Sequence, residues 1–474
     1  MSQLLSLLLR SAALATILAA LSAKAESPPV ALKTALDAYV QEQDPAYGFE
    51  LVKTLPHKGF TAYILKMRSQ TWRSKEEVDR VLWEHDIKVI VPDTLLTETG
   101  LLFIGGGANG RESPNTVMKE LAQVALATGS VVSELGQVPN QPLRFLDDPE
   151  KEDRTEDSLV AYTWDKFLQG GDARWLARFP MTKSAVRAMD TISSFCGSNV
   201  VEQVHVKRYV VAGGSKRGWT TWMTAAVDKR VVGIVPIVID MLNVRPSFQH
   251  HFQAYGFFAP AVGDYVSQGI MDWQDTERYG KLLELVEPFE YRERFTMPKL
   301  MLNAAGDQFF LPDSSQFYFD QLPGEKYLRY VPNGDHSLRE TDAYETLLAY
   351  YAMLLTDAER PKFSWKSAEE GHLHVIAEDK PSEAKLWQAH NSKTRDFRKD
   401  TIGAGWSATV LKPDEQGNYV ARVAKPDKGW TAMFIELSYP TPAKVALKVT
   451  TSVEVIPKAL PFPPFEPKRG GPKS

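Results

Sequence analysis

A serine preceded by two glycines follows an apolar, β-branched run in VVAGGSKRGWTTW, residues 210–222. The run is typical of a buried parallel strand, and the stretch after the glycines predicts a helix. A serine on such a strand-to-helix turn is the nucleophile of the G-x-S-x-G pattern. Here Gly213 holds the first glycine position, but Arg217 holds the second and the next glycine is Gly218. The spacing fits a nucleophile at Ser215 and fits equally a turn serine without chemistry.

Two residues further along the chain could activate this serine. A serine nucleophile needs a base, and the base needs an acid that holds its tautomer. Asp307 follows the predicted strand 299–306, and His336 follows the predicted strand 326–332. Because the carboxyl ends of parallel strands meet at one edge of a sheet, we expect both side chains beside Ser215. The order Ser, Asp, His is that of α/β hydrolases and predicts a catalytic triad for acyl transfer to water.

Backbone N–H groups could stabilise the oxyanion of such a reaction. The residue after the nucleophile usually donates one N–H, here that of Lys216. The glycine-rich stretch FIGGGANG (103–110) offers a second from Gly106 or Gly107. This stretch lacks the G-K-[ST] ending of a phosphate-binding loop, so nucleotide binding is disfavoured. The side chains of Lys216 and Arg217 could contact an acidic substrate or form ion pairs, and we count Arg217 among the substrate-binding candidates.

Other carboxylates and histidines compete for these roles. Asp240, at the end of a predicted strand, could supply the acid instead of Asp307. Asp313 and Asp335 lie in nearby loops, where aspartates usually cap turns. His250 and His251 could serve as a base near the inserted segment, but adjacent residues point different ways on a helix, which disfavours a metal pair. His372 and His374 alternate on a strand without a carboxylate or cysteine at ligand spacing, and we interpret them as surface residues. The sequence therefore predicts no metal site, and the proposed chemistry requires no organic cofactor.

Predicted strands and helices alternate along residues 26–368, which predicts a mainly parallel sheet flanked by helices, an α/β-hydrolase fold. A long aromatic segment at about 241–296 interrupts this alternation. An insertion of this kind can be a cap over the site or additional helical packing. Its Phe257 and Phe258 are candidates for substrate contact.

The pattern changes after residue 368. Short alternating strands and turns along 369–456 predict an all-β sandwich of immunoglobulin or fibronectin type. Residues 457–474 are Pro-rich, and we expect this tail to be extended or disordered at its end.

The N-terminal residues 1–25 read as a secretory signal peptide. Arg10 precedes an apolar run, and Ala23 and Ala25 form an A-x-A cleavage pattern. The alternative is a membrane anchor, but the apolar run is shorter than the ~20 residues that span a bilayer. We therefore expect export to the periplasm or the medium, without stable membrane insertion.

Composition excludes several classes of protein. The chain has 474 residues and a net charge of -4 without a basic stripe, so a nucleic-acid partner is not expected. It has one cysteine, which rules out an intramolecular disulfide and a C-x-x-C redox or zinc site.

Four segments of this sequence resemble the PhoPQ-activated pathogenicity-related family: GGSKRGWTTW, LLFIGGGANG, LNAAGDQFFLPDS and YVPNGDHSL. The resemblance spans residues 30–455 and implies an α/β-hydrolase fold with a C-terminal β domain. It places Ser215, Asp307 and His336 at the triad positions. It implies no substrate, and the charged residues after the serine also resemble the elbow of glucuronoyl esterases.

Taken together, these features predict a secreted serine hydrolase that cleaves an ester or amide, with a peptide or a carbohydrate ester as substrate. The alternative is a secreted binding or signalling protein that keeps the scaffold without its chemistry. The oligomeric state is left open.

Overall fold

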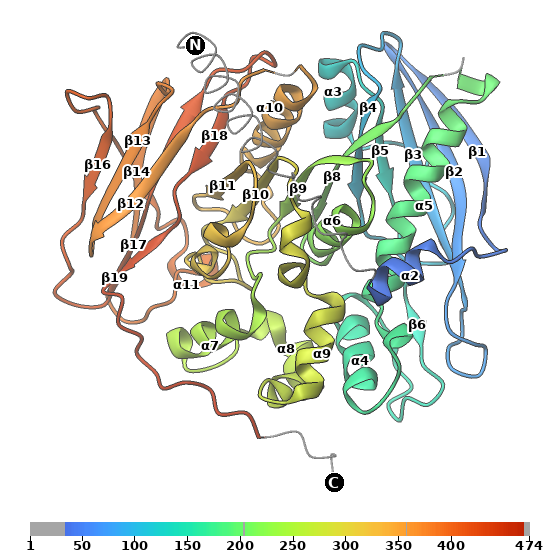
Figure 1. The fold of residues 1–474 in the computed structure, drawn as a ribbon, viewed down its shortest axis with the longest axis horizontal. Coiled ribbons are helices and arrows are strands. Elements are labelled where there is room, and N and C mark those ends of the chain that lie inside the picture. The colour runs from blue at the N-terminus through green and yellow to red at the C-terminus, as the bar shows by residue number, and fades with distance from the viewer. Residues whose placement is uncertain (1–33, 202–203, 357, 469–474) are drawn as a thin grey trace, which may run out of the picture. The chain divides into compact units, whose positions relative to one another are not determined.

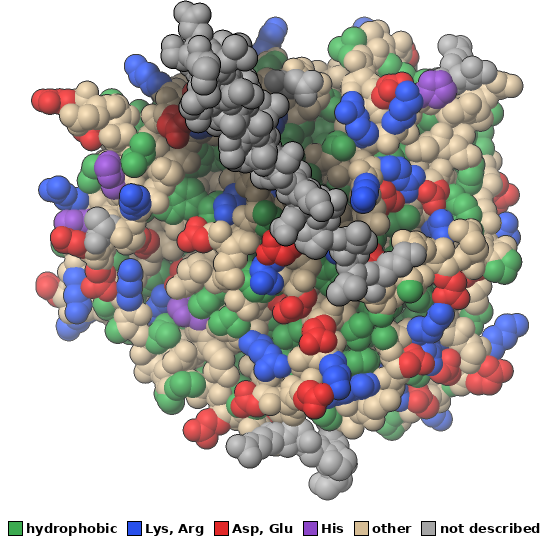
Figure 2. Space-filling model, in the orientation of Figure 1, with side chains coloured by type: hydrophobic (Ala, Val, Ile, Leu, Met, Phe, Trp, Pro, Cys, Tyr) green, Lys and Arg blue, Asp and Glu red, His purple; other side chains and the backbone are tan. Residues whose placement is uncertain are grey.

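The computed structural model describes residues 34–468, apart from 202–203 and 357. The predicted signal peptide, 1–25, lies outside the described residues. Within the described part of the chain, no helix is both long enough and apolar enough to cross a bilayer. Figure 2 shows Lys and Arg side chains interspersed with Asp and Glu side chains over the visible face.

A mixed sheet forms the centre of the fold, in the strand order β1-β2-β3-β5-β4-β8-β9-β10-β11. The strands from β5 to β11 are parallel, whereas β1, β2 and β3 pair antiparallel with their neighbours. Their bounds are β1 (Gly48–His57), β2 (Phe60–Thr71), β3 (Leu82–Pro92), β4 (Thr99–Ile104), β5 (Val132–Leu135), β8 (Arg208–Gly214), β9 (Val231–Ile237), β10 (Lys299–Ala304) and β11 (Lys326–Val331). The predicted α/β class, a mainly parallel sheet flanked by helices, is confirmed.

Helices cover both faces of this sheet (Figure 1). Val211 of β8 belongs to a core that includes residues of α2 (Ala35–Gln41), α5 (Arg178–Cys196) and α6 (Lys216–Val227). Its neighbours Val210 and Ala212 belong to a second core with residues of α3 (Lys119–Thr128) and α10 (Ala343–Leu355). Since successive strand side chains point to opposite faces, a strand buried on both faces has a continuous apolar run. The burial of β8 on both faces explains the continuous apolar run before Ser215.

The segment between β9 and β10 is helical throughout most of its length. It contains α7 (Val244–Tyr255), η3 (Pro260–Val262), α8 (Gly263–Ser267), η4 (Ile270–Trp273), α9 (Glu277–Val286) and η5 (Pro288–Arg294). Helix α4 (Glu156–Leu168) packs against α8 and α9, and the rings of Trp164 and Tyr265 lie 5.5 Å apart. Two short strands, β6 (Leu143–Arg144) and β7 (Asp153–Arg154), precede α4, and η1 (Ala173–Trp175) follows it. Figure 1 shows α4, α7, α8 and α9 grouped on one side of the sheet.

The C-terminal strands extend the central sheet. Strand β18 pairs antiparallel with β11 through Leu328 and Thr450, and the sheet continues as β17, β14 and β15, with β19 also on β17. A separate three-stranded sheet has the order β12-β13-β16. The bounds are β12 (Phe363–Glu369), β13 (His372–Ala377), β14 (Glu383–Asn391), β15 (Ser407–Val410), β16 (Tyr419–Arg422), β17 (Trp430–Tyr439), β18 (Leu447–Thr450), β19 (Glu454–Ile456) and a short helix, α11 (Lys399–Ile402). The sequence predicted these strands but not the continuity with the central sheet, and an immunoglobulin-like arrangement stays a prediction.

The described part of the Pro-rich tail lies along α7. The N–H of Phe462 donates to the carbonyl of Gln253 at 3.1 Å. The backbone N–H and C=O of Phe465 both bond the side-chain amide of Gln249 at 3.1 Å. The Phe465 ring packs against Phe252 at 5.1 Å. The tail up to residue 468 is therefore extended and held by specific contacts.

Candidate active site

Ser215 occupies a strained turn between β8 and α6. Its φ of 57° and ψ of -125° lie where residues with a side chain are rarely found, a feature that concentrates at functional sites. Its N–H donates to the carbonyl of Ile237 at 2.8 Å. A Cβ on Gly213 would lie 2.8 Å from the carbonyl oxygen of Arg217, and a Cβ on Gly218 would lie 2.9 Å from that of Gly213. The crowded positions are therefore 213 and 218, which explains why the second glycine comes one residue later than in G-x-S-x-G.

His336 and Asp307 form a direct pair after β11 and β10. The Nδ1 atom of His336 lies 2.9 Å from Oδ1 and 2.8 Å from Oδ2 of Asp307, which is buried. Asp307 Oδ1 also accepts the N–H of Phe309 at 2.7 Å, and the His336 N–H donates to Gln308 Oε1 at 2.9 Å. A carboxylate at Nδ1 assigns the proton to that nitrogen and leaves Nε2 as an acceptor.

Ser215 and His336 line one groove of about 360 Å³, together with Gly214, Ile237 and Leu338. Among the described residues, the Ser215 hydroxyl has no hydrogen-bond partner, so the bond to His336 that proton transfer requires is not formed in this state. Such bonds are often long in free enzymes and tighten when substrate binds. The structure thus brings the three predicted residues to the same sheet edge, with two of the three in direct contact.

The rival carboxylates have other partners. Asp240 accepts hydrogen bonds from the hydroxyls of Tyr318 at 2.5 Å and Tyr330 at 2.6 Å. Burial raises the pKa of Asp240 to about 7, although the tyrosine hydrogen bonds oppose this shift. Because its two oxygens each accept a tyrosine hydroxyl, Asp240 does not hold His336.

Asp313 and Asp335 differ from one another. Asp335 accepts the N–H of Ser337 at 2.9 Å and stabilises a turn, as predicted. Asp313 does not cap its 3-10 helix; it pairs with His250 Nε2 at 2.9 Å and with Arg395 at 2.5 Å. The turn-cap prediction for Asp313 was wrong because a buried arginine from the C-terminal part of the chain reaches it.

The predicted oxyanion donors lie around the elbow. Among the described residues, no acceptor receives a hydrogen bond from the backbone N–H groups of Lys216, Gly106 and Gly107. Gly107 has a φ of 134°, which favours glycine, and a Cβ on Gly106 would lie 2.6 Å from the Arg217 guanidinium. The glycine loop after β4 therefore approaches the start of α6 closely. Its donation to an oxyanion stays a prediction.

The cations after Ser215 form ion pairs with the start of α4. Lys216 Nζ lies 2.8 Å from Glu156 Oε2 and 2.9 Å from Asp157 Oδ2. The Arg217 guanidinium lies 2.6 Å from Glu156 Oε1 and donates to the Val138 carbonyl at 2.5 Å. Arg217 lines neither cavity at Ser215. Glu156 holds the Arg217 side chain against the glycine loop, and its contact with substrate stays a prediction.

Glu156 gives a pH-dependent contribution to stability. Burial raises its pKa, but the Arg217 hydrogen bond and the Lys216 charge together lower it to about 2. A lowered folded-state pKa adds stability above the unfolded-state value of ~4.3, and this stability is lost as pH falls towards 2. Glu156→Gln should therefore lower the free energy of unfolding at pH 7 by about 1 kcal/mol, because the ion pair is partly exposed, and the loss should be smaller at pH 3. Thermal unfolding at pH 7 and pH 3 measures this loss of stability, and Glu112→Gln, a change at an exposed residue, is the control. An equal loss at the two pH values would contradict the prediction.

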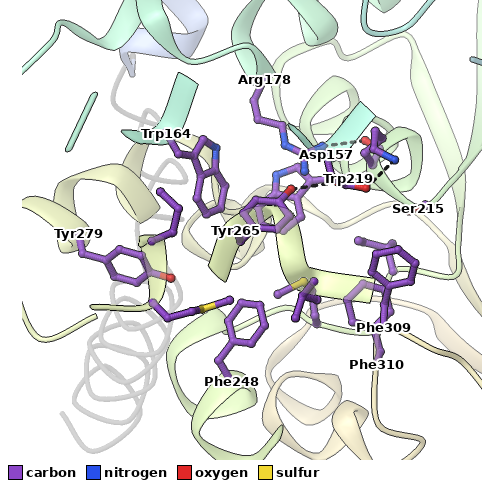
Figure 3. Close-up of a pocket in the computed structure, with 16 residues that line it drawn as sticks. Asp157, Trp164, Arg178, Ser215, Trp219, Phe248, Tyr265, Tyr279, Phe309 and Phe310 are labelled. Carbon is purple, nitrogen blue, oxygen red and sulfur yellow. Dashed lines mark hydrogen bonds and ion pairs between the residues drawn. The ribbon is translucent and has the colours of Figure 1, made fainter. Parts of the chain in front are cut away.

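A second, narrower cavity of about 30 Å³ opens at Ser215 on the side of the helical insertion (Figure 3). Most of its lining is apolar, and the charged residues on it are Asp157, Arg178 and Lys216. The apolar lining residues are Trp164, Trp219, Ile239, Met241, Phe248, Val262, Tyr265, Ile270, Met271, Tyr279, Phe309 and Phe310.

Neither Phe257 nor Phe258 lines this cavity or the groove. Phe257 is exposed, and the Phe258 ring packs on Phe252 and Phe465, so both lie toward the C-terminal tail. The adjacent aromatic residues Phe309 and Phe310 do line the narrow cavity. They were not among the predicted substrate contacts, although they closely follow the predicted triad acid in GDQFF.

The adjacent histidines of the insertion, His250 and His251, have structural partners. His251 Nε2 accepts the N–H of Ala259 at 2.9 Å, and His250 pairs with Asp313. Within the ranges that the structure describes, no group of three or more His, Cys, Asp or Glu side chains could hold a metal ion.

Comparison with known proteins identifies the family. Residues 36–398 match the model of the PhoPQ-activated pathogenicity-related protein family. The chain belongs to this family. Autocrine proliferation repressor protein A of Dictyostelium discoideum is 37% identical to this chain over 458 residues, which cover 90% of this chain and 92% of that protein.

Two solved structures resemble the chain more distantly. An acetyl xylan esterase from Paenibacillus sp. R4 has a TM-score of 0.48 and 18% identity, covering 69% of this chain and 97% of that one. Acetyl xylan esterase 1 from Thermoanaerobacterium sp. JW/SL YS485 has a TM-score of 0.47 and 14% identity, covering 68% and 92%.

Proposed function

We propose that this chain is an exported serine hydrolase of the α/β-hydrolase type, which cleaves an ester or amide through Ser215, His336 and Asp307. The observation that carries the proposal is the Asp307–His336 pair, which lies on the same groove as a serine in a strained elbow. The predicted substrate classes, a peptide or a carbohydrate ester, remain part of the proposal.

In the proposed mechanism, His336 Nε2 takes the proton of Ser215 as Oγ attacks the carbonyl carbon. Asp307 holds the imidazole in the required tautomer and stabilises the imidazolium that forms. The N–H groups of Lys216 and Gly106 or Gly107 stabilise the oxyanion. His336 then protonates the leaving group, and water activated by His336 hydrolyses the acyl-enzyme.

A second candidate is a secreted signalling protein without catalysis. The name of the Dictyostelium relative describes a repressor and not an enzyme. The strained backbone at Ser215 favours the first candidate, because such strain persists only where the surrounding structure enforces it and clusters at active sites.

Covalent labelling distinguishes the two candidates. We expect a fluorophosphonate probe to add one equivalent to the folded protein, and mass spectrometry of the digested protein should place the adduct on Ser215. A folded protein that remains unlabelled by both this probe and the smaller phenylmethylsulfonyl fluoride would reject the hydrolase. An adduct on another serine would reject Ser215 as the nucleophile.

A further inference from the structure

Arg178, the first residue of α5, is a buried cation on the narrow cavity beside Ser215. It is 3% exposed, and its Nη1 donates to the Lys216 carbonyl at 2.9 Å. Its buried Nε has no hydrogen-bond partner among the described residues. In Figure 3 its side chain ends among Asp157, Trp219 and Tyr265, toward the Ser215 end of the cavity. The Nε–H group of Arg178 is therefore a buried donor without a hydrogen-bond partner among the described residues.

No carboxylate of the described chain pairs with this guanidinium within 4 Å. The neighbouring Asp157 uses one oxygen for Lys216 Nζ at 2.9 Å and the other for the Tyr265 hydroxyl at 3.1 Å. The other buried arginines of the described residues each have a carboxylate partner; these are Arg154 with Asp148, Arg329 with Glu436 and Arg395 with Asp313. Because a buried charge is normally paired, Arg178 differs from these arginines in having no carboxylate in direct contact; its guanidinium lies over the Trp219 ring, 4.6 Å from the ring centroid.

The two cavities at Ser215 separate the two halves of a substrate. In the proposed reaction His336 protonates the leaving group, so that group must lie beside His336. His336 lines the wider groove and not the narrow cavity. The acyl half of the substrate would then lie in the narrow cavity, and the charged residues that line this cavity are Arg178, Lys216 and Asp157.

We propose that the Ser215 site takes esters whose short acyl chain ends in a carboxylate, and that Arg178 binds this carboxylate. The inference rests on the proposed hydrolase function and names its substrate class. A guanidinium binds carboxylate through charge-assisted hydrogen bonds, and Nε is the donor left for it. The apolar walls of the narrow cavity suit the methylene groups of a short acyl chain such as succinyl, and Arg178 is the charged group on the lining with a donor left for its carboxylate.

A matched pair of esters tests the proposal. Monoethyl succinate carries the carboxylate, and ethyl 4-methylpentanoate replaces its two oxygens with methyl groups. We expect the wild-type kcat/KM, from ethanol release, to be at least about 30-fold higher for the succinate, because a site built for a hydrogen-bonded group strongly rejects its apolar analogue. Arg178→Met should remove this preference. Arg178→Lys, which keeps the charge without the fork, should retain part of it.

Arg154→Met is the matched control, since Arg154 is also 3% exposed but lines neither cavity. It should leave the ratio of the two kcat/KM values unchanged. A wild-type protein without preference, or an Arg178→Met protein that loses both activities equally, overturns the proposal. If the Arg178 variants do not fold, the wild-type preference alone decides.

A binding measurement separates this proposal from the hydrolase function. Calorimetry with Ser215→Ala should detect monoethyl succinate and not ethyl 4-methylpentanoate, and the added Arg178→Met change should abolish that binding. This outcome supports the anion site even if fluorophosphonate labelling has rejected the nucleophile. Equal binding of both esters, or no binding of either, overturns the anion site even if labelling has succeeded.

Discussion

Ser215→Ala is expected to lower kcat/KM for ester hydrolysis by at least about 10⁴-fold. The hydroxyl is the attacking atom, and losses of about 10⁶-fold are known for triad serines, while oxyanion donors and binding alone leave a residual rate. Stability should change by no more than about 0.5 kcal/mol, because alanine keeps the Cβ and among the described residues the hydroxyl has no partner to lose. Steady-state rates with p-nitrophenyl butyrate and thermal unfolding of both proteins measure the two effects.

Ser193→Ala controls for the loss of a hydroxyl elsewhere. Ser193 lies on α5, bonds the Val206 carbonyl at 2.8 Å and the Tyr209 hydroxyl at 2.7 Å, and lines neither cavity. The kcat/KM of Ser193→Ala should stay within about threefold of wild type, because Ser193 contacts neither cavity at Ser215. A Ser215→Ala protein within tenfold of wild type would place the nucleophile on another residue.

The sequence predicted the candidate triad better than the residues around it. Each of the three residues, Ser215, Asp307 and His336, follows a predicted strand. In a parallel sheet the carboxyl ends of all strands lie at the same edge, so the three residues must lie at that edge. The substrate contacts are different, because a pocket wall is made by packing. Phe257 and Phe258 are aromatic and lie in the insertion, yet nothing local shows that they turn toward the tail.

Charged residues illustrate the same limit. Arg217 is adjacent to the elbow and was the natural candidate for substrate contact, but Glu156 on α4 neutralises it. Arg178 is far from Ser215 in sequence and reaches the cavity only because α5 packs against α6. Sequence spacing gives no signal for such a residue. In the same way, alternation predicted the C-terminal strands, but strand partners depend on contacts that a local pattern does not encode.

Arg329→Met is expected to lower the free energy of unfolding by about 3–5 kcal/mol, because it removes one partner of a buried pair. Arg329 is 1% exposed on β11, pairs with the buried Glu436 of β17, and bonds Asp342 at 2.8 and 3.1 Å. Strand β18 lies between β11 and β17, so the pair spans the junction at which the central sheet continues into the C-terminal strands. Urea unfolding measures the change.

The double variant Arg329→Met, Glu436→Met separates an uncompensated charge from lost packing. Removing both partners leaves no buried carboxylate without a cation, so most of the lost stability should return. A double variant as unstable as Arg329→Met would show that the loss comes from packing at the junction. His336 lies in the loop that follows β11. If β11 keeps its position without this link to the C-terminal strands, the folded Arg329→Met molecules should still react with the fluorophosphonate probe. Labelling per folded molecule therefore shows whether the continuous sheet also positions the Asp307–His336 pair.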